Sequence, residues 1–307
     1  MGLRIRTNIA SLNAQRRLAK STEALQESGN KLASGKRINK AADDAAGLAI
    51  SSNLGADIRS LNQAKRNAND GVSLVQTAEG GLEETTNMLT RLRELAVQGA
   101  SDTIGETERG FLNKEFVALK DEIDRIANAT EFNGTRLIVG NAEIGDEIAN
   151  APGTFPLEIQ VGKDYFTGVD GIDQPNQVNI IKIDLGKLNA FTDGEGSLDI
   201  GRAEEGTRVD SKQNAQQSIN KLDAAIVKVS DYRSYLGAIQ NRLGSTIDNL
   251  STATENLTAA NSRILDTDFA EETAKYTSAN ILQQAGASIL GQANQKPQIA
   301  LGLLQNL

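Results

Sequence analysis

The chain of 307 residues contains no cysteine and no histidine. Without cysteine it forms neither a disulfide nor a thiolate metal site. Without histidine it lacks the residue that proteins use most often as a general base and as a metal ligand. A zinc protease of the H-E-x-x-H type needs two histidines, so this chain does not encode one. The composition therefore predicts a protein that is not an enzyme and that holds no metal and no cofactor.

Aromatic residues and positive charge are also scarce. Only 4% of the residues are aromatic, tryptophan is absent, and the formal net charge is −8. Few aromatics suit long packed helices better than a thick globular core, and the negative charge argues against general nucleic-acid binding. The sequence shows no transmembrane run, and its start lacks the apolar core of a signal peptide. We therefore expect neither a nucleic-acid partner nor a membrane partner.

Large apolar residues recur seven apart in two long stretches. The first run is Leu54, Leu61, Ala68, Val75, Leu82, Leu89 and Ala96, and the second is Leu222, Val229, Leu236, Leu243, Leu250, Leu257 and Ile264. This spacing places one apolar stripe along a helix. At 1.5 Å per residue the second stretch is a rod of roughly 65 Å, which cannot bury its own stripe. Two rods of equal length predict antiparallel packing with these residues as the rod core.

Shorter signals mark helix ends beside the rods. Gly35 and Gly99 fit helix stops, and Asp43 or Asp44 fits the cap of the first rod, as Asp210 or Ser211 fits that of the second. The pattern Thr103-x-x-Glu106 is a capping-box signal. A third helix of about five turns is predicted after it by the 4-3-4-3 spacing of Leu112, Phe116, Leu119, Ile123 and Ile126.

Both ends of the chain predict amphipathic helices that need a partner. Residues 1–40 carry nine Lys or Arg against two Glu. Mitochondrial transit peptides and nucleic-acid arms share that pattern, but a solvated helix face that awaits a partner explains it more simply. Repetition of one such contact without rotational closure gives a helical filament. The apolar residues that we expect at this interface are Ile5, Ile9, Leu12, Leu25, Leu32, Ile281, Leu282, Ile289, Leu301, Leu303 and Leu304.

The middle of the chain has a different character. Residues 141–210 hold 14 acids against five bases, ten glycines and three of the four prolines. Alternating apolar residues predict two short strands, at Phe155, Leu157, Ile159 and Val161 and at Ile181, Ile183 and Leu185. Asp170, Asp173 and Asn176 lack the spacing of an EF-hand, so an acidic exposed insertion is the better interpretation. The predicted fold is mainly α, with long antiparallel helical rods from both chain ends and a small central β-hairpin region at about 133–210.

The residues themselves resemble bacterial flagellin. The match includes Ile5-Arg-Thr-Asn-Ile-Ala-Ser-Leu-Asn-Ala-Gln near the start and Leu92-Arg-Glu-Leu-Ala-Val-Gln-Gly-Ala in the first rod. It continues in 32–50, 68–71, 256–264 and 281–298, so that the matching stretches come from both ends of the chain. Arg6 stands where many relatives carry Asn. The middle is short for the family, which implies a form without large outer domains.

The resemblance implies a structural subunit that self-assembles into the helical filament of the bacterial flagellum, outside the cell. It implies that residues 1–44 and 267–307 form the inner helical domain and that 45–266 form the rod domain. The expected partners are further copies, the flagellar type III export apparatus, a secretion chaperone at the C-terminal helix, and the hook–filament junction and cap proteins. Subunits of this family are added at the distal tip. The competing hypothesis is a coiled-coil adaptor, which predicts a small oligomer with ordered ends.

The family is also recognised by an animal Toll-like receptor. The corresponding motif here begins at Arg91, and the resemblance carries the receptor contacts over to Arg91, Leu95 and Glu115. The charge of Arg91 and an exposed Leu95 would fit a binding hot spot. Contacts between rods in a polymer explain the same residues.

Overall fold

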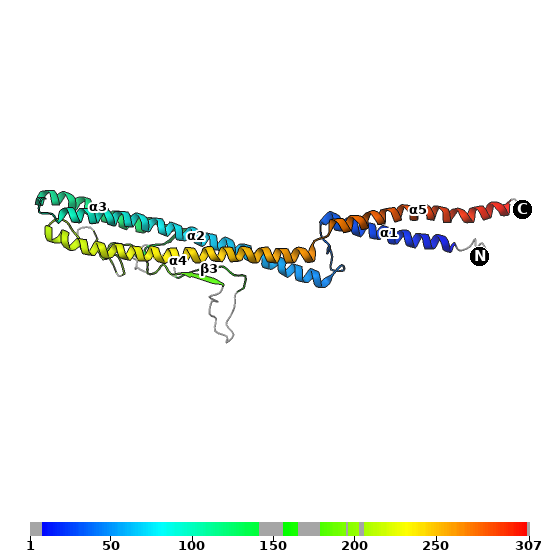
Figure 1. Cartoon of the computed structure of the whole chain (residues 1–307), viewed down its shortest axis with the longest axis horizontal. Coiled ribbons are helices and arrows are strands. Elements are labelled where there is room, and N and C mark those ends of the chain that lie inside the picture. Colours follow the sequence, from blue (N-terminus) through cyan, green and yellow to red (C-terminus); the bar gives the residue numbers. More distant parts are fainter. Residues whose placement is uncertain (1–7, 141–155, 165–178, 195, 203–205, 306–307) are drawn as a thin grey trace, which may run out of the picture. The chain divides into compact units, whose positions relative to one another are not determined.

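The computed structural model describes residues 8–140, 156–164, 179–194, 196–202 and 206–305, with backbone alone from 296 onward (Figure 1). Its elements are α1 (Ile9–Ser34), α2 (Ala45–Gly99), α3 (Glu106–Ala129), β1 (Glu131–Phe132), β2 (Thr135–Arg136), β3 (Leu157–Gln160), β4 (Ile180–Ile183), α4 (Lys212–Leu265) and α5 (Phe269–Gln305). The prediction of a mainly helical chain with a small β region is confirmed. The chain divides into two compact units: the terminal unit, residues 1–58 with 255–307, and the rod unit, residues 59–254.

Local chemistry explains where the helices begin and end. Gly35 ends α1 in the left-handed conformation, with φ of 68°, which a residue without a Cβ adopts at little cost. Asp44 caps α2, because its Oδ1 accepts the Gly47 N–H at 2.8 Å. Ser211 caps α4, since its Oγ accepts the Asn214 N–H at 3.3 Å. Asp43, next to the α2 cap, instead accepts hydrogen bonds from backbone N–H groups of the preceding loop.

The predicted capping box before α3 is wrong. The helix begins at Glu106, and the residue at its N-cap is Gly105, which has no side chain to accept a hydrogen bond. Thr103 instead shares a 2.7 Å hydrogen bond with the Ser101 hydroxyl. The turn from α2 is closed by Arg109, which donates to the Gly99 carbonyl at 2.8 Å and to the Ser101 carbonyl at 2.9 Å.

In the rod unit, α2 and α4 run antiparallel and α3 lies beside α2 (Figure 1). The register follows from two cross-helix ion pairs, Arg93 with Asp223 and Glu79 with Arg233. The members of the predicted core that are fully buried include Leu82, Leu89, Leu222, Leu236 and Leu243, and Leu61 and Leu250 are nearly so. The outer members Leu54, Leu257 and Ile264 are half-buried and belong to the terminal unit.

The β region consists of two antiparallel pairs. Asn133 and Gly134 connect β1 to β2 with φ of 51° and 77°, the positive values that a two-residue hairpin turn requires. β3 pairs with β4 from Leu157 opposite Ile183 to Gln160 opposite Ile180. The predicted strands are therefore present, although β4 ends before Leu185. Phe155, Asp170, Asp173 and Asn176 lie outside the described residues.

Two side chains of α3, one helical turn apart, bind the segment that leads into α4. The Asp124 carboxylate accepts the Thr192 N–H at 2.8 Å and the Thr192 hydroxyl at 3.0 Å, and it pairs with Arg202. Four residues earlier, the buried Lys120 ammonium donates to the Thr207 carbonyl at 3.2 Å. Burial lowers the pKa of Lys120 to about 8, because the charged form loses its hydration. The rod unit thus contains a buried titratable group that the sequence pattern did not reveal.

Candidate assembly surface

Helices α1 and α5 form an antiparallel pair in the terminal unit (Figure 1). The Asn8 amide donates to the Ala293 carbonyl at 2.8 Å, and the Ser11 hydroxyl donates to Asn294 Oδ1 at 2.8 Å. Further along, the Ser21 hydroxyl donates to the Ala279 carbonyl at 3.1 Å. These bonds follow the length of the pair, and they favour one register because a shift would separate each donor from its acceptor.

Small residues line the seam between the two helices. Its buried members include Ser11, Ala14, Ser28, Ala279 and Ala293. A Cβ on Gly286 would meet Leu18 at 3.4 Å, so the backbones approach closely at that point. Side chains of this size bury little apolar area, and the seam alone therefore stabilises the pair weakly.

Several large apolar side chains of this pair point outward. Exposed fractions are 54% for Ile9, 61% for Ile281, 59% for Leu282 and 57% for Ile289, and Leu12 is also exposed. Leu25 and Leu32 are half-buried. The predicted interface side chains of Ile5, Leu301, Leu303 and Leu304 lie outside the described residues. An exposed apolar face of this kind is typical of a surface that a partner covers.

A groove of about 760 Å³ runs along this face between α1 and α5, and we call it the terminal groove. Its floor is made of small residues, among them Ala14, Ala24 and Ala279. Leu282 and Ile289 form apolar walls on α5, and the exposed Arg17 and Lys20 stand on the α1 side. A second hollow beside it includes Ile281. The groove is thus apolar inside and basic along the α1 edge, and the ion pair of Glu271 with Lys275 lines its end on α5.

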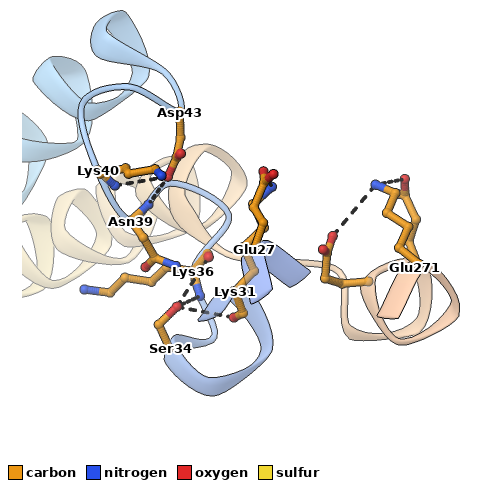
Figure 2. Close-up of polar contacts among 10 residues, drawn as sticks. Glu27, Lys31, Ser34, Lys36, Asn39, Lys40, Asp43 and Glu271 are labelled. Atoms are coloured by element: carbon orange, nitrogen blue, oxygen red, sulfur yellow. Dashed lines mark hydrogen bonds and ion pairs between the residues drawn. The ribbon is translucent and has the colours of Figure 1, made fainter. Parts of the chain in front are cut away.

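The two chain segments that enter and leave the terminal pair are joined to each other. The Arg37 N–H donates to the Leu265 carbonyl at 2.7 Å, and the Thr267 N–H donates to the Gly35 carbonyl at 3.0 Å. In the same loop, Asp43 Oδ2 accepts the N–H groups of Asn39 and Lys40 (Figure 2). These backbone donors lower the pKa of Asp43, with the Asn39 N–H as the largest cause.

The residues of the predicted receptor contact are only partly accessible. The Arg91 guanidinium binds Glu115 of α3 at 2.8 Å and Glu94 at 3.0 Å, and all three side chains are well exposed. The Glu115 hydrogen bond is the main reason that the pKa of Arg91 is raised. Leu95 is only 1% exposed, so the expectation of an exposed Leu95 is wrong. α2 packs against both α3 and α4 here, and Leu95 belongs to the core between them.

Sequence reasoning missed the small seam residues, although a signal was present. Ala14, Ser21 and Ser28 are spaced seven apart, as are Ala279, Gly286 and Ala293. A search for large apolar residues at heptad spacing passes over such a stripe. It therefore found the half-buried Leu25 and Leu32 and the exposed apolar side chains, but not the small residues between which the helices pair.

The described residues contain neither a cluster of potential metal ligands nor a helix that could span a membrane. Within the described ranges, acidic side chains nowhere gather in a group of three or more that could hold a metal ion. None of the helices that the structure describes combines the length and hydropathy that a bilayer crossing needs. What the geometry offers is a paired helix surface with exposed apolar side chains.

Comparisons with known proteins agree along nearly the whole chain. A family model for the bacterial flagellin N-terminal helical region matches residues 5–143, and one for the bacterial flagellin C-terminal helical region matches residues 219–304. A flagellin of Halalkalibacterium halodurans is 42% identical over 98% of this chain and 99% of its own length. A flagellin of Bacillus subtilis is 41% identical over 99% of this chain and all of its own length. The solved structure of Bacillus cereus flagellin is 31% identical and covers 64% of this chain and 94% of its own, with a TM-score of 0.45.

Proposed function

The chain belongs to the bacterial flagellin family, and from this premise we propose that the α1–α5 pair is the surface by which its copies assemble. The protein is a structural subunit of the flagellar filament, which lies outside the cell. One observation carries the assignment of the surface. The pair encloses small side chains and exposes Ile9, Leu12, Ile281, Leu282 and Ile289, which leaves its apolar area for a partner.

The assignment of filament layers is part of the same proposal. Residues 1–44 and 267–307 form the inner layer, and 45–266 form the rod layer outside it. Helix breaks at 35–44 and 266–268 support this division. The compact units divide elsewhere, within α2 and α4. The beginning of α2 and the end of α4 belong to the terminal unit, where the Ser51 hydroxyl donates to Asn261 Oδ1 at 2.7 Å.

Elongation of short filament seeds tests the proposal. Full-length protein should extend seeds seen by electron microscopy, and a chain truncated to 45–266 should not. Ile289→Ser should slow elongation, because it removes an exposed apolar side chain, whereas Gln292→Ser on the same helix should leave the rate near that of the parent. A truncated chain that extends seeds as well as the full chain would overturn the proposal.

The exposed apolar side chains of α5 also support the assignment of the remaining partners. We assign a secretion chaperone to α5, where Ile281 and Leu282 need cover before assembly. Export then proceeds through the flagellar type III apparatus, and addition occurs at the distal tip against the cap and junction proteins. Binding of a candidate chaperone to the full chain, and its loss in an Ile281→Ser, Leu282→Ser variant, tests the first of these steps.

Receptor recognition is a second proposal, supported by the exposed Arg91–Glu115 pair on adjacent helices. An animal Toll-like receptor would contact these two side chains directly, and Leu95 would act by packing beneath them. Arg91→Ala should weaken binding to the receptor ectodomain without changing the unfolding midpoint. Arg125→Ala, which removes another exposed, ion-paired cation, on α3, is the matched control. Equal affinity of the Arg91 variant and the parent would refute the contact.

A further inference from the structure

A second feature of the terminal unit is complementary to the terminal groove. Phe269 is the first residue of α5 and is 57% exposed, although phenylalanine is usually buried. Two exposed acidic residues, Asp266 and Asp268, precede it in the sequence, whereas Glu272 is buried and Glu271 lines the terminal groove. We call Phe269 with Asp266 and Asp268 the aromatic knob. It combines one large apolar side chain with an acidic collar, the reverse of an apolar groove with a basic edge.

Most of the collar is held in place by local bonds. Asp268 Oδ1 accepts the Ala270 N–H at 2.8 Å and caps the helix. Glu271, which lies next to the knob at the end of the groove, pairs with Lys275 at 2.8 Å, and both are exposed (Figure 2). Asp266 is exposed, and its backbone joins the bridge to Lys36. These contacts fix the start of α5 and leave the Phe269 ring directed away from a core of its own.

The Phe269 ring cannot reach the apolar walls of its own groove. The groove lining on α5 extends from Glu271 to Ile289, and Phe269 is separated from the walls at Leu282 and Ile289 by 13 to 20 residues. At 1.5 Å per residue this is about 20–30 Å along a rigid helix. A second copy, moved by that distance along the helix axis, brings its knob level with the walls of the groove.

We propose that the aromatic knob of one copy docks in the terminal groove of the next. Phe269 lies between Leu282 and Ile289 of that copy, and the acidic collar faces Arg17 and Lys20. Aromatic residues in apolar pockets are the usual anchors of protein interfaces. An arginine beside the ring adds a cation–π contact. Phe269 and the groove walls are different surfaces of one chain, so the contact is head-to-tail, and it gives an open filament when its rotation does not close into a ring.

This inference rests on the proposed assembly surface and adds a stagger of about 20–30 Å between the copies in contact. Cysteine crosslinking tests it, because the chain has no cysteine of its own. A Phe269→Cys, Leu282→Cys variant should form disulfide-linked ladders when its filaments are oxidised. A bond within one chain is excluded, since a disulfide needs Cα atoms within about 7 Å. A Phe269→Cys, Leu12→Cys variant places its second cysteine outside the groove lining and should give no ladder.

Charge exchange provides an independent measurement. Lys20→Glu should slow seed elongation on the order of tenfold, because it sets an acid against the collar. Adding Asp266→Lys to the same chain should restore most of the rate, while Asp266→Lys alone should slow it. Double variants that elongate seeds without ladders, together with charge variants that show no rescue, would overturn the docking while the assembly surface stands. If the unmodified full chain failed to elongate seeds, that result would instead overturn the assembly surface itself.

Discussion

In the rod unit, large apolar residues at heptad spacing lie inside, whereas in the terminal unit the seam is small and most large residues lie outside. Leu82 and Leu89 of α2 are fully buried against α4 and α3. Ala14 and Ala279 occupy the equivalent inner positions of the α1–α5 pair, while Leu12 and Ile289 are exposed. The comparison teaches that periodicity predicts a helix with an apolar stripe, and that the size of the side chains between two helices decides how much apolar area the pair buries.

The difference has an energetic consequence. A fully buried leucine contributes about 1.5–3 kcal/mol to folding, so the rod unit gains stability from each core layer. An alanine or serine seam gains far less, and a helix pair of this kind depends on partners for most of its apolar burial. The rod unit therefore buries its apolar stripe within one copy, whereas the terminal pair leaves Ile9, Leu282 and Ile289 exposed.

A pair of leucine truncations should separate the two units most strongly. Leu89→Ala in the rod core should lower the free energy of unfolding by about 2–5 kcal/mol, because it leaves a cavity. Leu282→Ala on the exposed face of α5 should change it by less than about 0.5 kcal/mol, yet slow seed elongation. Denaturant unfolding of the monomer measures the first effect and seeded growth the second. Equal loss of stability in the two variants would remove the contrast between the units.

The pH dependence of the rod unit should reveal Lys120. Its folded pKa of about 8 lies below the ordinary 10.5, so above pH 8 the unfolded chain holds more protons than the folded one. Stability should therefore rise between about pH 8 and 10.5, by up to about 3 kcal/mol from this residue. Lys120→Met should remove that rise when urea unfolding is compared at pH 7.5 and 10. The exposed Lys114, changed to Met, is the control and should keep it. A parent chain whose stability is flat over this range would contradict the assignment.

Two neighbouring glycines of α2 should respond with opposite signs. A Cβ on Gly81 would lie 2.5 Å from Thr130 Oγ1, whereas a Cβ on Gly80 meets nothing within 4 Å. Gly80→Ala should stabilise the rod unit by about 0.5–1 kcal/mol, since alanine is the better helix former. Gly81→Ala should destabilise it by about 1–3 kcal/mol through overpacking. Thermal unfolding of the two variants decides the point, and a gain of stability in both would show that Thr130 does not pack tightly on α2.

Much of the fold is readable in the sequence. Heptad spacing predicts α2 and α4, glycine at 35 marks the end of α1, and alternation predicts β3 and β4. These features depend on neighbouring residues and on the backbone, so no distant contact is needed to infer them. The family can be inferred in the same way, because each motif that resembles flagellin is a run of consecutive residues.

Only the tertiary structure decides what is inside. Leu95 and Leu282 are both leucines on amphipathic helices, yet the first is buried and the second is 59% exposed. Two neighbouring helices cover α2 at Leu95, while α5 has α1 as its neighbour and meets it through small residues. The pKa of Lys120 and the terminal groove have the same origin. Each depends on which segments, far apart in the sequence, come to lie around it, and the periodicity of one helix contains no information about its neighbours.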